Sequence, residues 1–212
     1  MMLPSPADLY KANQKYFIQY LELLKKWNQK INLTSLTDDQ KIIELHFIDS
    51  LYVFPKIVSH VPRGTILDFG SGGGFPGIPI GIVCPNAKIT VTDSIKKKCD
   101  FMDCVVRELH LKNVSVQNKR LDSNHSIGEF DVIVSRATTS LLEFIKTTSI
   151  NLEPNGIFIS MKSADVEAEI SELEASQIGN LFKVVSKDRY TLPLSVKVRT
   201  LIIVSRVPRE TI

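Results

Sequence analysis

Apolar side chains in the first quarter of the chain recur at steps of three and four, the spacing of one face of an amphipathic helix. This spacing predicts a helix over residues 8–31, which ends at the polar run that follows. A second pattern predicts a helix over residues 38–54, with Thr37 or Asp38 as its N-cap. The buried face of the first helix is expected to hold Leu9, Ala12, Tyr16, Phe17, Tyr20, Leu21, Leu24, Trp27 and Ile31.

From residue 64 onward, short apolar runs alternate with segments of helical periodicity. Such alternation is typical of a parallel sheet with helices on both faces. The last two runs are separated only by residues 188–198, so they should form an antiparallel hairpin at one side of the sheet. We expect a helical extension over residues 1–62 and an α/β domain over residues 63–212. The predicted strands are 65–69, 88–93, 114–118, 130–135, 156–162, 181–187 and 199–206, and the predicted helices of the domain are 76–83, 95–110, 140–150 and 165–177.

One predicted strand runs directly into a glycine-rich loop, Gly70-Ser-Gly72-Gly-Gly74. Glycine lets the backbone turn tightly and approach a ligand closely, and the helix that follows would direct free N–H groups toward that ligand. The next strand ends in Asp93, about 20 residues after the first glycine, where doubly wound folds place the carboxylate that holds a ribose. The pattern predicts a site for a nucleoside-containing cofactor.

Three classes of site have loops of this kind. A phosphate-binding loop of an NTPase is excluded because no Lys-Ser or Lys-Thr follows the glycines. A dinucleotide site matches G-x-G-x-x-G from Gly72 to Gly77, although this match begins two residues late and contains Pro76. An S-adenosylmethionine site, D-x-G-[S/T]-G-x-G, fits in order from Asp68 to Gly74, and its acidic residues suit a cationic ligand. The loop favours S-adenosylmethionine and leaves the dinucleotide site as the alternative.

The segment after the glycines resembles one family in particular. Phe75-Pro-Gly-Ile-Pro79 is similar to the bacterial small-subunit rRNA guanine-N7 methyltransferases, the RsmG or GidB family. Four further blocks agree in type and order with that family. They are Trp27-Asn28 with Ile31-Asn32-Leu33-Thr34, His46-Phe47-Ile48-Asp49-Ser50-Leu51, Asp93-Ser94 with Lys97 and Phe101, and Phe130-Asp131 with Ser135-Arg136-Ala137, and Lys162 matches a lysine that closes the fifth strand.

The resemblance implies a fold, a reaction and a set of residues. The fold would be the Rossmann-like class I S-adenosylmethionine-dependent methyltransferase fold, an α/β fold with a seven-stranded, mostly parallel sheet, an antiparallel C-terminal hairpin and an N-terminal helical extension. The reaction would be methyl transfer from S-adenosylmethionine to N7 of guanosine 527, in the 530 loop of 16S rRNA. The cofactor contacts that it implies are Gly70, Phe75, Leu121, Asp122 and Arg136.

The residues themselves add to this set. Gly72 and Gly74 belong to the same loop, and Asp93 would accept hydrogen bonds from the ribose hydroxyls. Arg136 follows a buried strand at the carboxyl edge of the sheet, where an arginine could hold the methionine carboxylate or the substrate, so we expect it to be the catalytic residue.

Contacts with 16S rRNA in the small ribosomal subunit are expected from His46, Lys162 and Arg199. His46 and Asp49 lie three residues apart on one predicted helical face, where they would contact the cofactor loop or the RNA, or form a hydrogen-bonded pair on the helix surface. A module that binds S-adenosylmethionine without transferring its methyl group is the rival to an enzyme.

Composition sets broad limits. The 212 residues carry a net charge of +3, which fits a local basic face. Three cysteines without a C-x-x-C spacing, and an N-terminus without the features of a secretory signal, indicate reduced thiols in a cytoplasmic protein. Four scattered histidines predict no metal site, no apolar run is long enough for a membrane span, and we expect a monomer.

Overall fold

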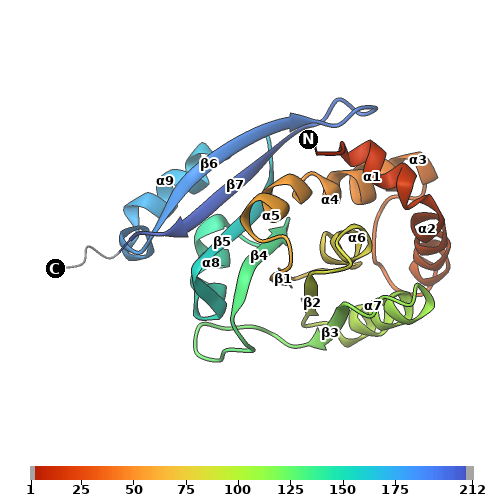
Figure 1. The fold of residues 1–212 in the computed structure, drawn as a ribbon, viewed down its shortest axis with the longest axis horizontal. Helices are drawn as coiled ribbons and strands as arrows, with labels where there is room; N and C mark the ends of the chain where they lie inside the picture. Colours follow the sequence, from red (N-terminus) through yellow and green to blue (C-terminus); the bar gives the residue numbers. More distant parts are fainter. Residues whose placement is uncertain (1–2, 209–212) are drawn as a thin grey trace.

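The structure is a computed structural model that describes residues 3–208. A seven-stranded sheet runs through it in the order β3-β2-β1-β4-β5-β7-β6, with the first five strands of this order parallel and β7 antiparallel to both of its neighbours (Figure 1). The predicted sheet and its C-terminal hairpin are therefore confirmed. The strands are β1 (Thr65–Phe69), β2 (Lys88–Asp93), β3 (Val114–Asn118), β4 (Phe130–Arg136), β5 (Leu152–Ser163), β6 (Phe182–Thr191) and β7 (Val198–Arg206).

The helices of the α/β domain lie close to their predicted positions. α6, α7, α8 and α9 each begin within two residues of the predicted start, and a 3-10 turn, η2 (Ser149–Asn151), completes the segment predicted after α8. A second 3-10 turn, η3 (Gln177–Asn180), leads into β6. The four α-helices are α6 (Gly77–Val83), α7 (Lys96–Glu108), α8 (Leu141–Thr148) and α9 (Glu167–Ala175).

The N-terminal extension differs from its prediction because each predicted helix is divided. The first is interrupted at Asn13, whose φ of −114° is not helical and whose side chain donates to the Leu9 carbonyl, so that one helix ends there and another begins. The second is capped by Asp38, as predicted, but then passes through a π-helix and restarts before Pro55. The elements are α1 (Pro6–Ala12), α2 (Gln14–Asn28), α3 (Asp39–Ile42), the π-helix η1 (Ile43–Ile48), α4 (Asp49–Leu51) and α5 (Phe54–His60).

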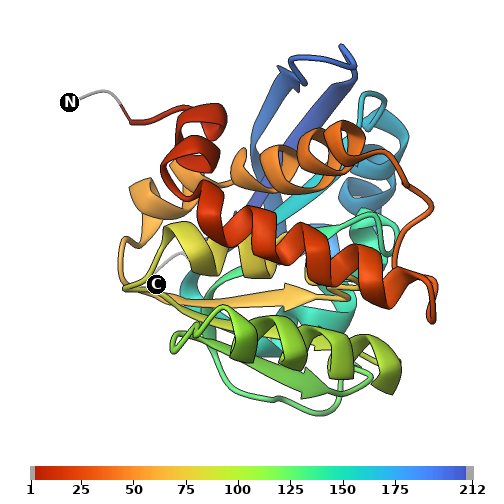
Figure 2. The same ribbon diagram turned by 90° about the vertical axis from the view of Figure 1, so that its right-hand side faces the viewer.

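Alternate residues of the central strands face two separate hydrophobic cores, one on each side of the sheet. Ile66 of β1 and Val132 of β4 face the core shared with the N-terminal helices, α6 and α7, while Leu67 and Ile133 face the core under α8 and α9. Figure 2 shows α2 lying beside α7 on the first of these faces. Because α2 buries Phe17 and Leu24 completely, at about 2 kcal/mol for each side chain, the extension is packed firmly on the sheet. A domain boundary at residue 62 stays a prediction.

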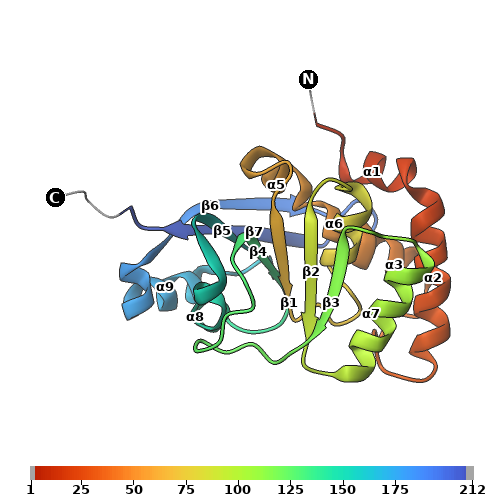
Figure 3. The same ribbon diagram turned by 60° about the horizontal axis from the view of Figure 1, so that its bottom comes forward.

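The parallel strands end at a common edge. β1, β2 and β3 run side by side in one direction, and Figure 3 shows them next to one another. In open α/β sheets the crevice beyond the carboxyl ends of the strands is the usual ligand site. This edge collects the loop after β1, which we call the glycine loop (residues 70–75), together with Asp93, Arg136 and Lys162.

Candidate active site

Positive φ angles at three glycines shape the glycine loop: +69° at Gly70, +59° at Gly72 and +88° at Gly74. Ser71 fastens the loop to β2. Its amide donates to the Thr92 carbonyl at 2.8 Å, and its hydroxyl accepts from the Thr92 amide at 3.2 Å. The loop is thus fixed to the ends of two adjacent strands.

Asp93, the last residue of β2, contacts this loop directly. Its Oδ2 accepts from the Gly72 amide at 3.0 Å, and its Oδ1 accepts from the Ile95 amide at 2.8 Å. Asp93 is 8% exposed, and Nζ of Lys98 lies 3.9 Å from Oδ2. The structure therefore brings together the glycines and the carboxylate that sequence analysis assigned to one cofactor site.

Asp68 is fully buried in β1, just before the glycine loop. Its Oδ2 accepts from the Gly77 amide at 2.7 Å, whereas its Oδ1 has no hydrogen-bond partner within residues 3–208. Burial raises the pKa of Asp68 to about 7, against the lowering effect of the Gly77 amide.

The glycine loop has room for a ligand at one position. A Cβ added at Gly72 would meet no atom within 4 Å, whereas a Cβ at Gly70 would lie 2.5 Å from Cγ2 of Thr138. The open side of Gly72 and the Asp93 carboxylate fit a nucleoside such as S-adenosylmethionine. They supply space and an acceptor for ribose hydroxyls.

The two residues predicted beside the adenine follow β3. Leu121 is 8% exposed and packs in the core under α8 and α9. Asp122 is exposed, and its Oδ1 accepts from the amides of Asn124 and His125 at 2.8 and 3.1 Å, so that it stabilises a turn. The contacts of Leu121 and Asp122 with a cofactor stay a prediction.

Phe75 connects the glycine loop to the N-terminal extension. Its ring is stacked between Tyr20 and His46, with ring centroids 5.4 and 4.7 Å away, and the guanidinium carbon of Arg136 lies 5.1 Å from its centroid. Phe75 is only 5% exposed. Its ring therefore has a packing role, and its predicted contact with the cofactor remains a prediction.

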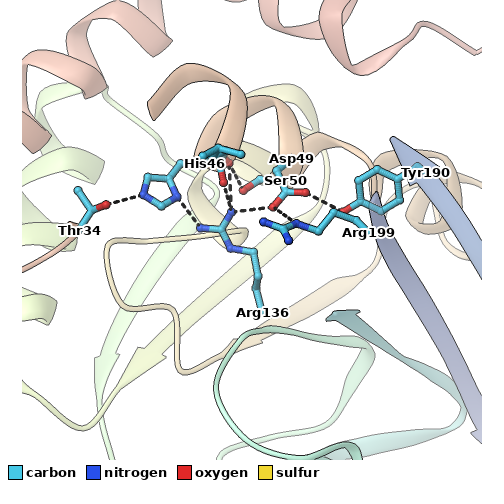
Figure 4. Close-up of polar contacts among 8 residues, drawn as sticks. Thr34, His46, Asp49, Ser50, Arg136, Tyr190 and Arg199 are labelled. Atoms are coloured by element: carbon cyan, nitrogen blue, oxygen red, sulfur yellow. Dashed lines mark hydrogen bonds and ion pairs between the residues drawn. The ribbon is translucent and has the colours of Figure 1, made fainter. Parts of the chain in front are cut away.

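Arg136 joins the end of β4 to the N-terminal extension (Figure 4). Its guanidinium donates to the Leu45 carbonyl at 3.0 Å, to Oδ2 of Asp49 at 3.3 Å and to Nδ1 of His46 at 3.1 Å. The Arg136 side chain is 14% exposed. The structure thus shows a contact with η1 and α4 that the sequence did not suggest, and the catalytic role of Arg136 stays a prediction.

His46 has a defined protonation state in this network. Its Nδ1 must accept, because a guanidinium only donates, so the proton is on Nε2, which lies 2.7 Å from the Thr34 hydroxyl. Burial, and after it the Arg136 cation, lower the pKa of His46 to about 3. The neutral ring therefore links Arg136 to the segment between α2 and α3.

Asp49 is the centre of the charged network, and it is 2% exposed. Its Oδ1 accepts from the Tyr190 hydroxyl at 2.7 Å, and its Oδ2 lies 3.8 Å from Nε of Arg199 as well as near Arg136 (Figure 4). Since His46 and Asp49 both bond to Arg136, their interpretation as a hydrogen-bonded pair on the helix surface is wrong.

Lys162 belongs to a second polar cluster, beside the first. Its Nζ donates to the Thr139 carbonyl at 2.6 Å and lies 2.7 Å from Oε2 of Glu169. The same Oε2 accepts from the Leu141 amide at 2.6 Å, at the start of α8. The predicted contacts of Lys162, His46 and Arg199 with RNA stay predictions.

A cleft of about 480 Å³ lies among these groups. Leu36 and Leu45 supply apolar walls from the N-terminal extension, and Ala137 and Met161 supply apolar walls from the ends of β4 and β5. A concave site with apolar walls and a few convergent polar groups is typical of a ligand pocket. Its polar lining consists of His46, Asp49, Arg136, Lys162, Ser163, Glu169 and Arg199.

Sequence analysis missed several residues that hold this region together, and Glu44 is the clearest. It is 2% exposed in η1, and it accepts from the amides of Leu194 and Ser195 in the loop between β6 and β7. These amides lower the pKa of Glu44 below its usual value although burial acts in the opposite direction. An acid inside an apolar helical pattern was the available signal.

Solved structures of methyltransferases share this fold. The ribosomal protein L11 methylase from Lactobacillus delbrueckii subsp. bulgaricus matches with a TM-score of 0.59, 18% identity and coverage of 82% of this chain and 81% of that one. An S-adenosylmethionine-dependent methyltransferase from Aquifex aeolicus matches with a TM-score of 0.56, 18% identity and coverage of 78% and 94%. The chain therefore has the class I fold of S-adenosylmethionine-dependent methyltransferases, as predicted.

The family model for rRNA small subunit methyltransferase G, or GidB, matches residues 13–190. The ribosomal RNA small subunit methyltransferase G of Aromatoleum aromaticum is 35% identical over 202 residues, which are 93% of this chain and 92% of the relative. That of Neisseria meningitidis serogroup C is 39% identical over 166 residues, 78% of each chain. The chain belongs to the small-subunit rRNA methyltransferase G family, and the predicted family is confirmed.

Membership of this family of S-adenosylmethionine-dependent methyltransferases also decides between the two remaining interpretations of the glycine loop, in favour of S-adenosylmethionine. Residues 3–208 contain no group of three or more His, Cys, Asp or Glu side chains placed to hold a metal ion. Within the same residues, no helix has both the length and the apolar character required to cross a membrane.

Proposed function

We propose that this chain methylates N7 of guanosine 527 in the 530 loop of 16S rRNA. The observation that supports this most is the placement of the cleft. It opens at the same sheet edge as the glycine loop, and Arg136, at the end of the strand next to β1, lines it and contacts Phe75 of the loop. A substrate base in the cleft would therefore lie beside a cofactor held by the glycine loop.

The cofactor pocket would be formed mainly by main-chain groups and carboxylates. In this proposal Gly70, Gly72 and Gly74 let the backbone approach the cofactor, and Asp93 accepts from the ribose hydroxyls. Leu121 and Asp122 would flank the adenine at the end of β3. When bound, S-adenosylmethionine supplies a methyl group on a positively charged sulfur atom.

The residues of the chain would act by alignment. N7 of guanine has a free lone pair and no proton, so the transfer requires no general base. Holding two reactants in line can contribute roughly 7–11 kcal/mol to lowering a barrier. Arg136 would supply this alignment because it holds η1 and α4, which border the cleft, at a fixed distance from the glycine loop.

Binding of 16S rRNA would use the cations of the cleft, Arg199 and Lys162. Arg199 is 26% exposed next to the buried Asp49, and Lys162 lines the same cleft. The neutral ring of His46 also lines the cleft and would contact the RNA without a charge. Interactions of cations with RNA phosphates weaken with salt. We further propose that the protein acts in the cytoplasm as a monomer, for which light scattering should give the mass of one 23.8 kDa chain.

The proposal can be tested directly. Small ribosomal subunits, or 16S rRNA, that lack the modification are incubated with the protein and S-adenosylmethionine carrying a labelled methyl group, and the modified nucleotide is mapped by mass spectrometry. We expect one 7-methylguanosine in the 530 loop. Label on another nucleotide or another atom would replace the proposed target. Binding of S-adenosylmethionine without transfer to any rRNA would support the module without enzymatic activity.

A further inference from the structure

The lining of the cleft suits a heterocycle, because apolar walls are combined with polar groups. Leu36 and Leu45 form apolar walls on the side of the N-terminal extension, and Ala137 and Met161 form them on the side of the sheet. Enzymes that modify a base take it out of the stack and hold it between apolar surfaces, while polar groups bond to its edges. The polar groups at this cleft therefore determine which base it accepts.

Two carboxylates line the cleft, and they differ in what they already bind. Both oxygens of Asp49 are occupied, Oδ1 by the Tyr190 hydroxyl and Oδ2 by Arg136, with Arg199 nearby. In Glu169, Oε2 accepts from the Leu141 amide and is paired with Lys162, whereas Oε1 accepts from no donor within residues 3–208. Glu169 thus combines a fixed carboxylate with an available acceptor at the cleft.

We infer that Glu169 recognises the Watson–Crick edge of the target guanine. Guanine presents two adjacent donors on that edge, the N1–H and the 2-amino group, and Oε1 of Glu169 has two lone pairs that can accept from both. Adenine has no N1–H and no 2-amino group, so it could not make these two bonds. The inference depends on the proposed function, because it assigns an edge of the base whose N7 is methylated.

The position of Glu169 in the fold agrees with transfer to N7. The strand order places β4 between β1 and β5, and Glu169 lies on α9, the helix that follows β5. N7 and the 2-amino group are on opposite sides of a guanine ring. A base with its Watson–Crick edge at α9 therefore turns N7 back toward β1, whose end carries the glycine loop.

Glu169 is held in place by groups that do not depend on RNA. The Lys162 side chain is only 11% exposed, and its Nζ is fixed by the Thr139 carbonyl as well as by Glu169. Together with the Leu141 amide, this lysine keeps Oε2 in position and limits the rotation of the carboxylate. A fixed acceptor discriminates between bases better than a mobile one, because a wrong base cannot recruit it into another geometry.

The experiment changes the hydrogen-bonding groups of residue 169 and of the target base in combination. Small subunits are reconstituted from 16S rRNA that carries guanosine, inosine or xanthosine at the target position, and kcat/KM for methyl transfer is measured with the unaltered protein and with Glu169→Gln. Inosine lacks the 2-amino group, and xanthosine carries a carbonyl oxygen there. Because Lys162 and the Leu141 amide only donate, the oxygen of a glutamine would face them and its amino group would face the cleft. There it can donate to the 2-carbonyl of xanthosine but not to the two donors of guanine.

We expect the unaltered protein to prefer guanosine over inosine, and both over xanthosine. In Glu169→Gln, kcat/KM for guanosine should fall roughly 10- to 100-fold, the usual cost of losing a hydrogen bond to a charged group, and the ratio of xanthosine to guanosine should rise. Impaired folding would lower kcat/KM for all three bases alike, so it cannot raise the ratio of xanthosine to guanosine. Glu167→Gln is the matched control, because Glu167 lies two residues earlier and pairs with the exposed Lys187; it should leave all three rates unchanged.

Equal losses for the three bases in Glu169→Gln would overturn the inference, since they would show that Glu169 only supports the start of α8. An unchanged ratio of xanthosine to guanosine would overturn it as well. If the unaltered protein modifies no guanosine in the small subunit, the proposed function fails, and the inference fails with it. Transfer to guanosine with an unchanged ratio in the variant counts against the inference alone.

Discussion

The glycine loop and the cleft lie at one sheet edge but are built differently. Around the glycine loop, most polar contacts come from residues 68–95, chiefly backbone amides that donate to carboxylates close by in the sequence. Tyr20, which bonds to Gly73 and stacks on Phe75, adds a contact with the N-terminal extension. Around the cleft, side chains from residue 34 to residue 199 meet one another, and the contacts join the N-terminal extension to β4, β6 and β7.

This difference separates two kinds of failure. A substitution in the glycine loop alters a surface that is held by short-range contacts, so cofactor affinity should change while the rest of the fold persists. A substitution in the cleft breaks contacts between distant parts of the chain, so transfer and stability should change together. The following substitutions test this separation, from the largest expected effect to the smallest.

Arg136→Ala should have the largest effect. Its removal leaves Asp49 with a weaker set of partners and frees η1 from the end of β4. Transfer should fall by roughly 100-fold or more, because misplacement by about 1 Å is enough for that. The free energy of unfolding should fall by about 3 kcal/mol, as when one partner of a buried ion pair is removed. Single-turnover transfer and urea unfolding measure the two effects, and transfer within tenfold of the unaltered protein would show that Arg136 is not needed for alignment.

Asp93→Ala should act on cofactor binding first. The variant removes the acceptor for the Gly72 amide and the proposed acceptor for the ribose. We expect the dissociation constant for S-adenosylmethionine to rise by roughly 10- to 100-fold, since a carboxylate bond is lost, and unfolding free energy to fall by about 1–2 kcal/mol. Calorimetry measures the affinity. Unchanged affinity would remove Asp93 from the cofactor site.

Gly72→Ala provides a finer test of the glycine loop. The added methyl group meets no protein atom within 4 Å, so the fold should lose only about 1–2 kcal/mol for the left-handed backbone. Affinity for S-adenosylmethionine should fall by roughly tenfold or more, because the methyl group occupies the space proposed for the ligand. Gly128→Ala, at another positive-φ glycine in an exposed segment before β4, is the control and should lose stability without losing affinity. Equal affinity in both variants would place the ligand elsewhere.

The smallest effect concerns pH, where the two regions should act in opposite directions. The pKa of Asp68 is raised to about 7, so the folded protein holds a proton there that the unfolded chain releases above its ordinary pKa of 3.8, and this stability is lost as pH rises toward 7. The pKa of His46 is lowered to about 3, so the unfolded chain takes up a proton below 6.5 and the protein loses stability as pH falls from there.

Substitution should separate these two opposing effects on the free energy of unfolding. Each changes that free energy by at most about 1.4 kcal/mol per pH unit. Between pH 4 and 6, only the titration of Asp68 should remain in His46→Gln, so the stability of this variant should fall as pH rises. In Asp68→Asn only the titration of His46 should remain, so the stability of that variant should rise with pH. Urea unfolding at a series of pH values measures both. Parallel curves for the two variants would show that these residues do not titrate as described.

The sequence predicted most of the sheet and of the glycine loop because both depend on local patterns. Alternating apolar runs gave β1, β2 and β3 with their observed bounds, and spacing alone assigned Asp93 to the same site as the glycine loop, which its bond with the Gly72 amide agrees with. The cleft could not be predicted in this way. Its contacts, such as Asp49 with Tyr190, join residues 141 positions apart, and no periodicity records which distant side chains will meet.

The breaks in the N-terminal extension were missed for a related reason. A π-helix usually occurs as a single turn within an α-helical segment, so the short η1 interrupts the apolar pattern over residues 38–54 too little to be recognised. At Asn13, a side chain that bonds to its own helix ended α1 within an otherwise continuous apolar pattern. In both places a local hydrogen-bond pattern interrupts the helix, although the apolar periodicity continues through it.

The contact of Glu44 with the loop between β6 and β7 has a consequence for biosynthesis. The Glu44 carboxylate leaves the ribosome about 150 residues before the Leu194 and Ser195 amides that donate to it. Until the last hairpin has emerged, Glu44 of a nascent chain lacks these donors and the cleft lacks Arg199. A newly made molecule can therefore complete the cleft only after its last hairpin has been made, whereas the residues of its glycine loop emerge much earlier.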